Sequence, residues 1–367
     1  MRPCSRWLLL LTITLLCGLP GPAVSQVGGS SPVQPEKQPP LNVDRDPVAS
    51  PDAETTGPQA NQPTATIGRD NGKYTLQRNV DEVVLNATVS DDKQHMVNTL
   101  TKDDFKVAED GVAQVISSFQ HQDIPIALGI LVDNSGSMRT KRQAVNTAAL
   151  DLVQHSNPDD ESFVVNFSDE AYIDQDFTSS IPKLRDGLSH IDSKGGTALY
   201  DAIMASADYL TKNAKRPKQV LLVITDGEDN ASSTTLEETV RRIQDLQGPV
   251  VYSIGLLYDD SGGGREGRRA KRALEMLSNE TGGISFFPKN LGQVDEIATE
   301  VARDIREQYT IGYHSTKPAA QGGFRSVHVE AHAKGYGKLI VRTRTGYYPN
   351  LKKAQVSAPR GSQPETN

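Results

Sequence analysis

Residues 126–138 read IALGILVDNSGSM, and this stretch decides the fold of the chain. Its first seven residues are apolar side chains and one glycine, which is the pattern of a strand buried on both faces. The run ends at Asp133, the hydroxyls of Ser135 and Ser137 follow at alternate positions, and a helical period begins at Arg139. We therefore expect Asp133, Ser135 and Ser137 in a tight strand-to-helix turn. Three oxygen side chains that converge there suit a hard cation such as Mg2+.

The middle of the chain, residues 123–308, alternates strand and helix patterns. Strand patterns fall at residues 126–133, 162–167, 171–177, 220–226, 250–256 and 284–287, and the last helical stripe covers 293–308. This alternation predicts an α/β fold, with a doubly wound, mostly parallel six-stranded sheet and helices on both of its faces. The strand at 171–177 follows its predecessor after only three residues, so we expect it to be an antiparallel hairpin partner at one edge.

A second apolar run, residues 220–224, also ends in a carboxylate, because Thr225, Asp226 and Gly227 follow it. In open α/β sheets, ligands bind beyond the carboxyl ends of the strands, where the winding direction reverses. If the two runs are neighbouring strands, Asp226 and Asp133 meet at that edge. The intervening loop KGGTA, residues 194–198, has two glycines that allow the hydroxyl of Thr197 to reach the same point.

These residues together resemble the von Willebrand factor A (VWA) domain and its metal-ion-dependent adhesion site. That motif is Asp-x-Ser-x-Ser, then a Thr in a loop, then an Asp after a buried strand. The matching residues here, in the family's order, are Asp133, Ser135, Ser137, Thr197 and Asp226. The resemblance covers residues 123–308 and implies a VWA/Rossmann-like sheet.

The resemblance also implies roles for the five residues. Ser135 and Ser137 would bind Mg2+, or else Mn2+ or Ca2+, directly, and Thr197 would bind in a state-dependent way. The two aspartates would act partly through water, and a carboxylate from a partner protein would complete the coordination. The simpler alternative is that Asp133 and Ser135 only cap the helix that follows them.

Residues near these ligands are candidates for a partner-binding rim. They are Asn134, Glu228 and Asp229, although loop charges of this kind are also found merely solvated. The glycine-rich, basic segment 262–272 lacks the ending of a phosphate-binding loop. We interpret it as a loop that runs into a basic helix, with contact to an acidic partner near the rim as the alternative.

The flanks of the central domain, residues 73–122 and 309–350, have β-strand patterns. Neither has enough strands for a stable sandwich, so the two are expected to pair into one small β-sandwich-like module. Two separate β elements packed on the central domain are the alternative. The stretches LTKDDF at 100–105, EDG at 109–111 and RTGYYP at 344–349 resemble the VWA-related exported proteins common in Acidobacteria.

The N-terminal residues 1–25 have the pattern of a secretory signal peptide. Two arginines precede the apolar stretch 7–16, and the small residues at 23–25 fit a cleavage site. Lipid attachment at Cys17 and a retained N-terminal anchor are the alternatives. The other cysteine, Cys4, also lies in this segment, so the mature chain would have no cysteine and no membrane span. An exported chain without cysteine fits the bacterial periplasm, the cell surface or secretion.

Residues 26–72 and 351–367 are rich in Pro, Gly, Ser, Gln and Thr, and they are predicted to be a disordered linker and a disordered tail. The net charge of -7, with no broad basic face, argues against nucleic-acid binding.

No catalytic motif accompanies the predicted cation site. HExxH and Gly-x-Ser-x-Gly are absent, and no nucleophile has an evident activating base. A metal-assisted hydrolase would have only Asp226, Glu228 or Asp229 as a base. The sequence thus predicts a non-enzymatic, adhesion-type module that binds a protein ligand with an acidic side chain. The alternative is an envelope structural or assembly factor in which the metal only stabilises the fold.

Overall fold

The computed structural model describes residues 82–258 and 264–350, together with the backbone of residues 46–47, 69–70 and 73–74. The predicted signal peptide, most of the predicted linker and the predicted tail lie outside the described residues. Inside the linker range, β1 (Asp46–Pro47) pairs with a strand of the central sheet, and β2 (Arg69–Asp70) pairs with β3 (Lys73–Tyr74). Within the described residues, no helix combines the length and the apolar character needed to cross a bilayer.

The central sheet contains the six predicted strands and, at one edge, the two-residue β1. The order after β1 is β10 (Ala171–Thr178), β9 (Glu161–Phe167), β8 (Ile126–Asp133), β11 (Lys218–Thr225), β12 (Val250–Gly255) and β13 (Ser285–Phe286). Strands β9, β8, β11, β12 and β13 are mutually parallel, and β10 is antiparallel to β9. The predicted mostly parallel sheet and its antiparallel edge strand are confirmed.

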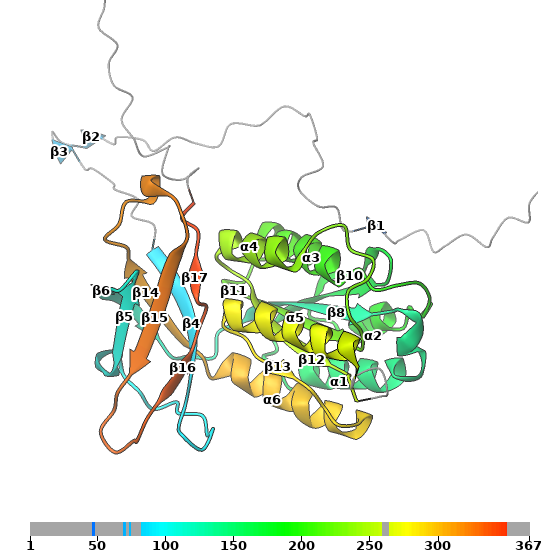
Figure 1. Ribbon diagram of the computed structural model, residues 1–367. Coiled ribbons are helices and arrows are strands. Elements are labelled where there is room, and N and C mark those ends of the chain that lie inside the picture. The colour runs from blue at the N-terminus through cyan, green and yellow to red at the C-terminus, as the bar shows by residue number, and fades with distance from the viewer. Residues whose placement is uncertain (1–45, 48–68, 71–72, 75–81, 259–263, 351–367) are drawn as a thin grey trace, which may run out of the picture. The chain divides into compact units, whose positions relative to one another are not determined.

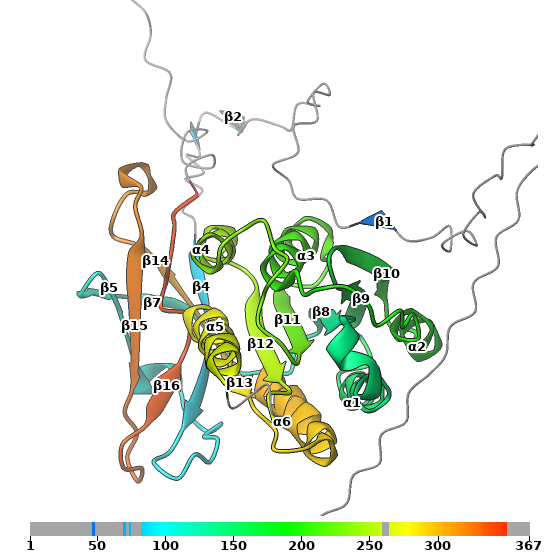
Figure 2. The same cartoon turned by 45° about the vertical axis from the view of Figure 1, so that its right-hand side comes forward.

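Helices cover both faces of this sheet (Figures 1 and 2). One face packs against α1 (Arg142–Gln154), α2 (Ile181–Leu188) and α6 (Val294–Arg306), and the other against α3 (Leu199–Asn213), α4 (Leu236–Leu246) and α5 (Arg265–Thr281). Strand β8 shows why both faces are apolar: Leu128 and Ile130 enter the first core, while Leu131 enters the second. The sheet therefore separates two hydrophobic cores.

The predicted start of α1 was three residues too early. The predicted helical period begins at Arg139, but a 3₁₀ turn, η2 (Gly136–Thr140), comes first, and the α-helix begins at Arg142. The basic residues after Gly264 form the first turns of α5, as predicted for a loop that runs into a basic helix.

The winding direction reverses between β8 and β11. The chain passes from β8 through α1 to β9 on one side, and later returns to β11 on the other side of β8. The loops that leave β8 and β11 therefore diverge, which exposes the carboxyl ends of both strands at one point. Asp133 and Asp226 lie at these two ends.

The two β flanks pair with each other in two four-stranded sheets. The first has the order β16 (Ile340–Arg342), β4 (Glu82–Ser90), β14 (Tyr309–His314) and β7 (Ile116–Gln120). The second has β17 (Gly346–Tyr347), β15 (Arg325–Ala331), β5 (Phe105–Glu109) and β6 (Val112–Gln114). Each sheet mixes strands from before and after the central domain, so the flanking β-sandwich-like module is confirmed. The predicted turn at 109–111 joins β5 to β6, with positive φ at Asp110 and Gly111.

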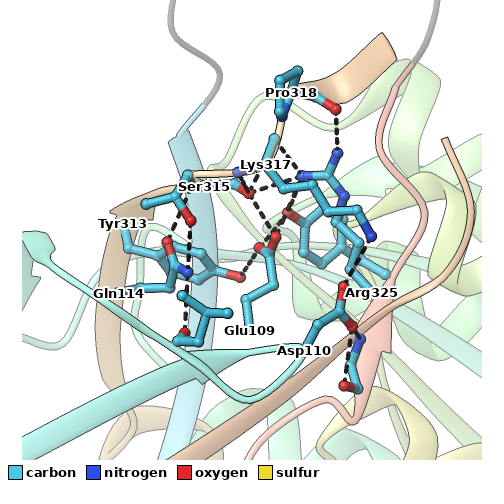
Figure 3. A network of polar contacts seen from close by, with 12 residues as sticks. Glu109, Asp110, Gln114, Tyr313, Ser315, Lys317, Pro318 and Arg325 are labelled. Atoms are coloured by element: carbon cyan, nitrogen blue, oxygen red, sulfur yellow. Dashed lines mark hydrogen bonds and ion pairs between the residues drawn. The ribbon is translucent and has the colours of Figure 1, made fainter. Parts of the chain in front are cut away.

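A buried polar network also joins the two flanks (Figure 3). Glu109 and Arg325 are 2% and 1% exposed, and their closest oxygen and nitrogen are 3.4 Å apart. The hydroxyls of Tyr313 and Tyr347 each donate to Glu109 Oε2 at 2.8 Å, and Ser315 donates to Oε1 at 2.5 Å. All of these partners come from the C-terminal flank. The carboxylate from the N-terminal flank is thus satisfied only when both flanks are folded together.

Candidate metal centre

Asp133 is the last residue of β8 and is fully buried. Its Oδ1 accepts a hydrogen bond from the Ser135 amide at 2.8 Å, and its Oδ2 accepts one from the Thr225 hydroxyl at 2.6 Å. Burial raises the pKa of Asp133 from 3.8 to about 6, although these hydrogen bonds oppose the shift and nearby Asp226 adds to it. Both oxygens already have a protein donor, which suits an indirect role beside a cation.

Three side-chain oxygens form a chain next to Asp133. The hydroxyls of Ser135 and Ser137 are 3.1 Å apart, and Ser137 donates to Asp226 Oδ1 at 2.8 Å. Adjacent ligands of an octahedral Mg2+ at about 2.1 Å are separated by about 3.0 Å. The spacing of these oxygens matches neighbouring positions around such an ion. The residues present therefore fit a small, hard cation.

The helix-capping alternative does not explain Ser135. This residue is the N-cap of η2, but its side chain makes no capping hydrogen bond and its hydroxyl faces Ser137 instead. Ser135 is buried, whereas Ser137 is exposed. The oxygen chain thus runs from the protein interior to the surface, where a ligand has access.

Thr197 reaches the same edge on a loop held by neighbouring polar groups. Gly195 has φ +81°, and a side chain there would overlap the carboxylate of Asp169. The next residue, Gly196, donates its amide to Asp169 Oδ1 at 2.7 Å, and the Thr197 amide donates to Asn230 at 2.9 Å. Thr197 is 3% exposed, and its hydroxyl lies 3.8 Å from the position that a Cβ would occupy at Gly227. Hydrogen bonds thus link the other four predicted ligand residues, and the Thr197 hydroxyl lies near Gly227, which follows Asp226.

Lys141 is part of this centre and was missed by the sequence reasoning. Its ammonium lies 2.8 Å from Asp226 Oδ2, and the side chains of Lys141 and Asp226 are 10% and 1% exposed. The same ammonium lies 5.5 Å from the centroid of the Tyr258 ring. Asp226 therefore faces Ser137 with one oxygen and a fixed positive charge with the other. The sequence signal that could have identified Lys141 is its spacing: it follows Ser137 by four residues, about one helical turn.

Arg142 holds the carboxyl end of β8 in place, and the sequence reasoning did not identify it. It is fully buried, and it donates to the Asp133 carbonyl at 3.4 Å, to Asn166 Oδ1 at 2.7 Å and to the Leu188 carbonyl at 3.2 Å. Burial lowers the pKa of Arg142 to about 10, which leaves the side chain charged at neutral pH. The guanidinium thereby ties the carboxyl end of β8 to β9 and to the end of α2.

The predicted rim needs correction. Asn134 is not exposed as a rim residue would be: it is 5% exposed, its side chain accepts from the Ser193 amide at 3.2 Å, and its carbonyl accepts from the Lys194 amide at 3.1 Å. It anchors the loop that leads to Thr197 and is not part of an exposed rim.

The other two rim candidates are half-buried. Glu228 pairs with Arg269 at 3.3 Å. Asp229 accepts from the Tyr200 amide at 3.1 Å and from the Ser232 hydroxyl at 2.5 Å. Asp229 therefore stabilises the start of α3, while Glu228 stays at the surface beside the centre.

Comparison with known proteins agrees with this architecture. Residues 128–228 match the family model of the von Willebrand factor type A domain, and this range contains all five predicted ligand residues. The chain thus carries a VWA domain of α/β fold. No curated protein matches the sequence.

Several solved structures are similar to the chain. A von Willebrand factor type A structure from Catenulispora acidiphila is 13% identical, with 75% of this chain and 74% of that chain covered and a TM-score of 0.43. An aerotolerance-related membrane protein from Bacteroides fragilis NCTC 9343, with multiple mutations to serines, is 20% identical, with 49% and 98% covered and a TM-score of 0.41. Proximal thread matrix protein 1 from the mussel byssus, with a zinc-occupied MIDAS motif, is 18% identical, with 55% and 50% covered and a TM-score of 0.42.

Proposed function

We propose that this chain is an exported, metal-dependent protein-binding module whose cation is bridged to a carboxylate of its partner. The observation that carries the proposal is the chain of oxygens from Ser135 through Ser137 to Asp226, spaced at 3.1 Å and 2.8 Å at the switch point of the sheet. Asp133 and Thr197 border the same point. Because hydroxyl and carboxylate oxygens are hard ligands, Mg2+ is the proposed cation, with Mn2+ or Ca2+ as substitutes.

The charges of the side chains favour an acidic ligand. Ser135, Ser137 and Thr197 are neutral, and Lys141 compensates the charge of Asp226 at 2.8 Å. With Asp133 as the remaining negative group, a bound divalent cation would therefore keep part of its positive charge and supply a centre that attracts oxygen anions. The exposed position of Ser137 leaves room for a carboxylate from outside.

We propose a binding role rather than catalysis. A hydrolase at this centre would need Asp226, Glu228 or Asp229 as its base. In the structure Asp226 pairs with Lys141, Glu228 pairs with Arg269, and Asp229 accepts from the Tyr200 amide. Each of these candidate bases is thus engaged by a donor or a cation.

The location follows from the N-terminal pattern. A signal peptide at 1–25 and a mature chain without cysteine support export to the bacterial periplasm, the cell surface or the medium. The flanking motifs support an origin among the exported VWA-related proteins of Acidobacteria.

An envelope structural or assembly factor is the second candidate. The ion pair between Lys141 and Asp226 favours it, because this pair by itself joins the start of α1 to the end of β11. In that case, cation binding would stabilise the fold without creating a binding surface.

Isothermal titration calorimetry with Mg2+ and Mn2+ tests the proposal. We expect the purified protein to bind both ions, and Ser135→Ala and Asp226→Ala to lose this binding. Ser189→Ala, at an exposed position beyond α2, is the matched control and should bind as the wild type does. Binding that survives in both variants would refute the site. A pull-down of envelope proteins with the purified protein, in Mg2+ and in EDTA, separates the two candidates. If the ions bind but the same proteins are captured under both conditions, the structural role is favoured.

A further inference from the structure

A cavity of about 270 Å3 lies beside the metal centre and is lined by positive charge. Its walls include Tyr258, Phe287 and Pro288, and the cationic side chains around it are Arg268, Lys271 and Lys289. Among the described residues, no carboxylate lines it. An apolar floor under three cations is suited to an acidic side chain with its methylene groups.

Two contacts place this cavity next to the proposed cation. The ring of Tyr258 lies 5.5 Å from the ammonium of Lys141, which itself pairs with Asp226. Arg269, the neighbour of Arg268 on α5, pairs with Glu228, two residues after Asp226. One extended peptide can therefore contact both places.

The charge around the cavity opposes that of the whole protein. The first eight residues of α5 contain five cations and one acid: Arg265, Glu266, Arg268, Arg269, Lys271 and Arg272. The chain as a whole has a net charge of -7. Cations in the first turns of a helix are also unfavourable for the helix dipole. An anionic ligand would offset part of the electrostatic cost of this cluster.

The cations are accessible to such a ligand. Arg268, Lys271 and Lys289 are exposed. Lys271 lies 5.0 Å above the Phe287 ring and 3.8 Å from Glu275, with both charged side chains about half exposed at 53% and 43%. Exposed pairs of this kind contribute little stability, so a ligand carboxylate can replace Glu275 at small cost.

We propose that this cavity is a second anchor for the acidic partner. The partner is a protein segment with at least two carboxylates, of which one reaches the cation and another enters the cavity between Arg268, Lys271 and Lys289. The inference rests on the proposed function for the first carboxylate.

Fluorescence anisotropy with a labelled oligoglutamate peptide tests this inference on the full chain, in Mg2+ and in EDTA. The double variant Arg268→Glu/Lys289→Glu should weaken binding in Mg2+ roughly tenfold or more, because both exposed positions then repel the peptide. Arg272→Glu is the control for a charge reversal on α5 outside the cavity lining, and it should weaken binding about twofold at most. Circular dichroism verifies that each variant is folded.

The outcomes separate the two proposals. If EDTA abolishes binding while the double variant binds like the wild type, the second anchor is refuted and the metal bridge stands. If the double variant loses binding while EDTA has no effect, the acidic-ligand cavity stands and the metal bridge is refuted. An equal loss in Arg272→Glu would show long-range attraction only and would overturn the cavity. No binding by the wild type in Mg2+ would also overturn it.

Discussion

The ammonium of Lys141 lies 2.8 Å from Asp226 Oδ2, while the other oxygen of this carboxylate accepts from Ser137. The centre therefore contains a cation of its own, fixed to the chain. A carboxylate that is 1% exposed would be costly without such a partner. Lys141 stabilises Asp226 when no metal is bound, and it reduces the negative charge that a metal would meet.

Replacing Lys141 by Met separates these two effects. We expect Lys141→Met to lose about 3 kcal/mol of unfolding free energy in EDTA, because Asp226 is left buried and unpaired. The same variant should bind Mg2+ more tightly, so that Mg2+ restores more stability to it than to the wild type. Urea unfolding in EDTA and in Mg2+ measures both effects. Lys212→Met, at an exposed position of α3, is the control. An equal loss of stability under both conditions would contradict this account.

The pH dependence of metal binding follows from Asp133. Burial raises its pKa from 3.8 to about 6. In the metal-free protein, this carboxyl contributes stability below its ordinary pKa, and the contribution is lost as the pH rises through about 6. A cation needs the deprotonated form, so Mg2+ affinity should fall about tenfold per pH unit below about pH 6.

Calorimetry across about pH 5 to pH 8 measures this dependence. Asp133→Asn is the comparison, because its amide cannot titrate and should leave a flatter profile. A wild-type affinity that stays constant over the whole range would exclude Asp133 from the centre.

The parts of the fold that rest on local patterns were predictable. The apolar run before Asp133 and the one before Asp226 both form buried parallel strands, because a strand covered on both faces needs continuous apolar sequence. The positions of the five predicted ligand residues were predictable because each follows such a run or lies in a glycine loop. The turn at 109–111 was also local, since glycine and aspartate tolerate positive φ.

Buried charges were not predictable, because their partners lie far away in the sequence. Lys141 meets Asp226 across 85 residues, and Arg325 meets Glu109 across 216. A lysine or arginine in a helical or strand pattern is normally solvated, so the pattern alone gives no reason to bury it. The prediction of Asn134 as a rim residue was wrong for the same reason. Its burial depends on the loop at 193–194, and the local sequence does not predict where this loop lies.

The network around Glu109 predicts that the β module depends on one carboxylate. Glu109→Gln keeps the size of the side chain but leaves Arg325 buried without its counter-charge, so we expect a loss of about 3 kcal/mol. Tyr347→Phe removes a single hydrogen bond to the carboxylate and should cost about 1.5 kcal/mol. Glu330→Gln, on the exposed side of β15, should change stability by less than about 0.5 kcal/mol. Urea unfolding compares the three variants. Equal stability of Glu109→Gln and Glu330→Gln would show that the network has no energetic role.

The loop that carries Thr197 gives a prediction about metal affinity. Gly195 has φ +81°, and a Cβ at this position would overlap the Asp169 carboxylate that accepts the Gly196 amide. Gly195→Ala must therefore move the loop or Asp169, and either movement displaces the Thr197 hydroxyl from the centre. Gly111→Ala is a matched control, because Gly111 also has positive φ, at +79°, but has nothing within 4 Å of the added Cβ. Both variants should lose about 1 kcal/mol from backbone strain, but only Gly195→Ala should weaken Mg2+ binding. Calorimetry and thermal unfolding of the two variants measure these effects, and an unchanged Mg2+ affinity in Gly195→Ala would remove Thr197 from the set of ligands.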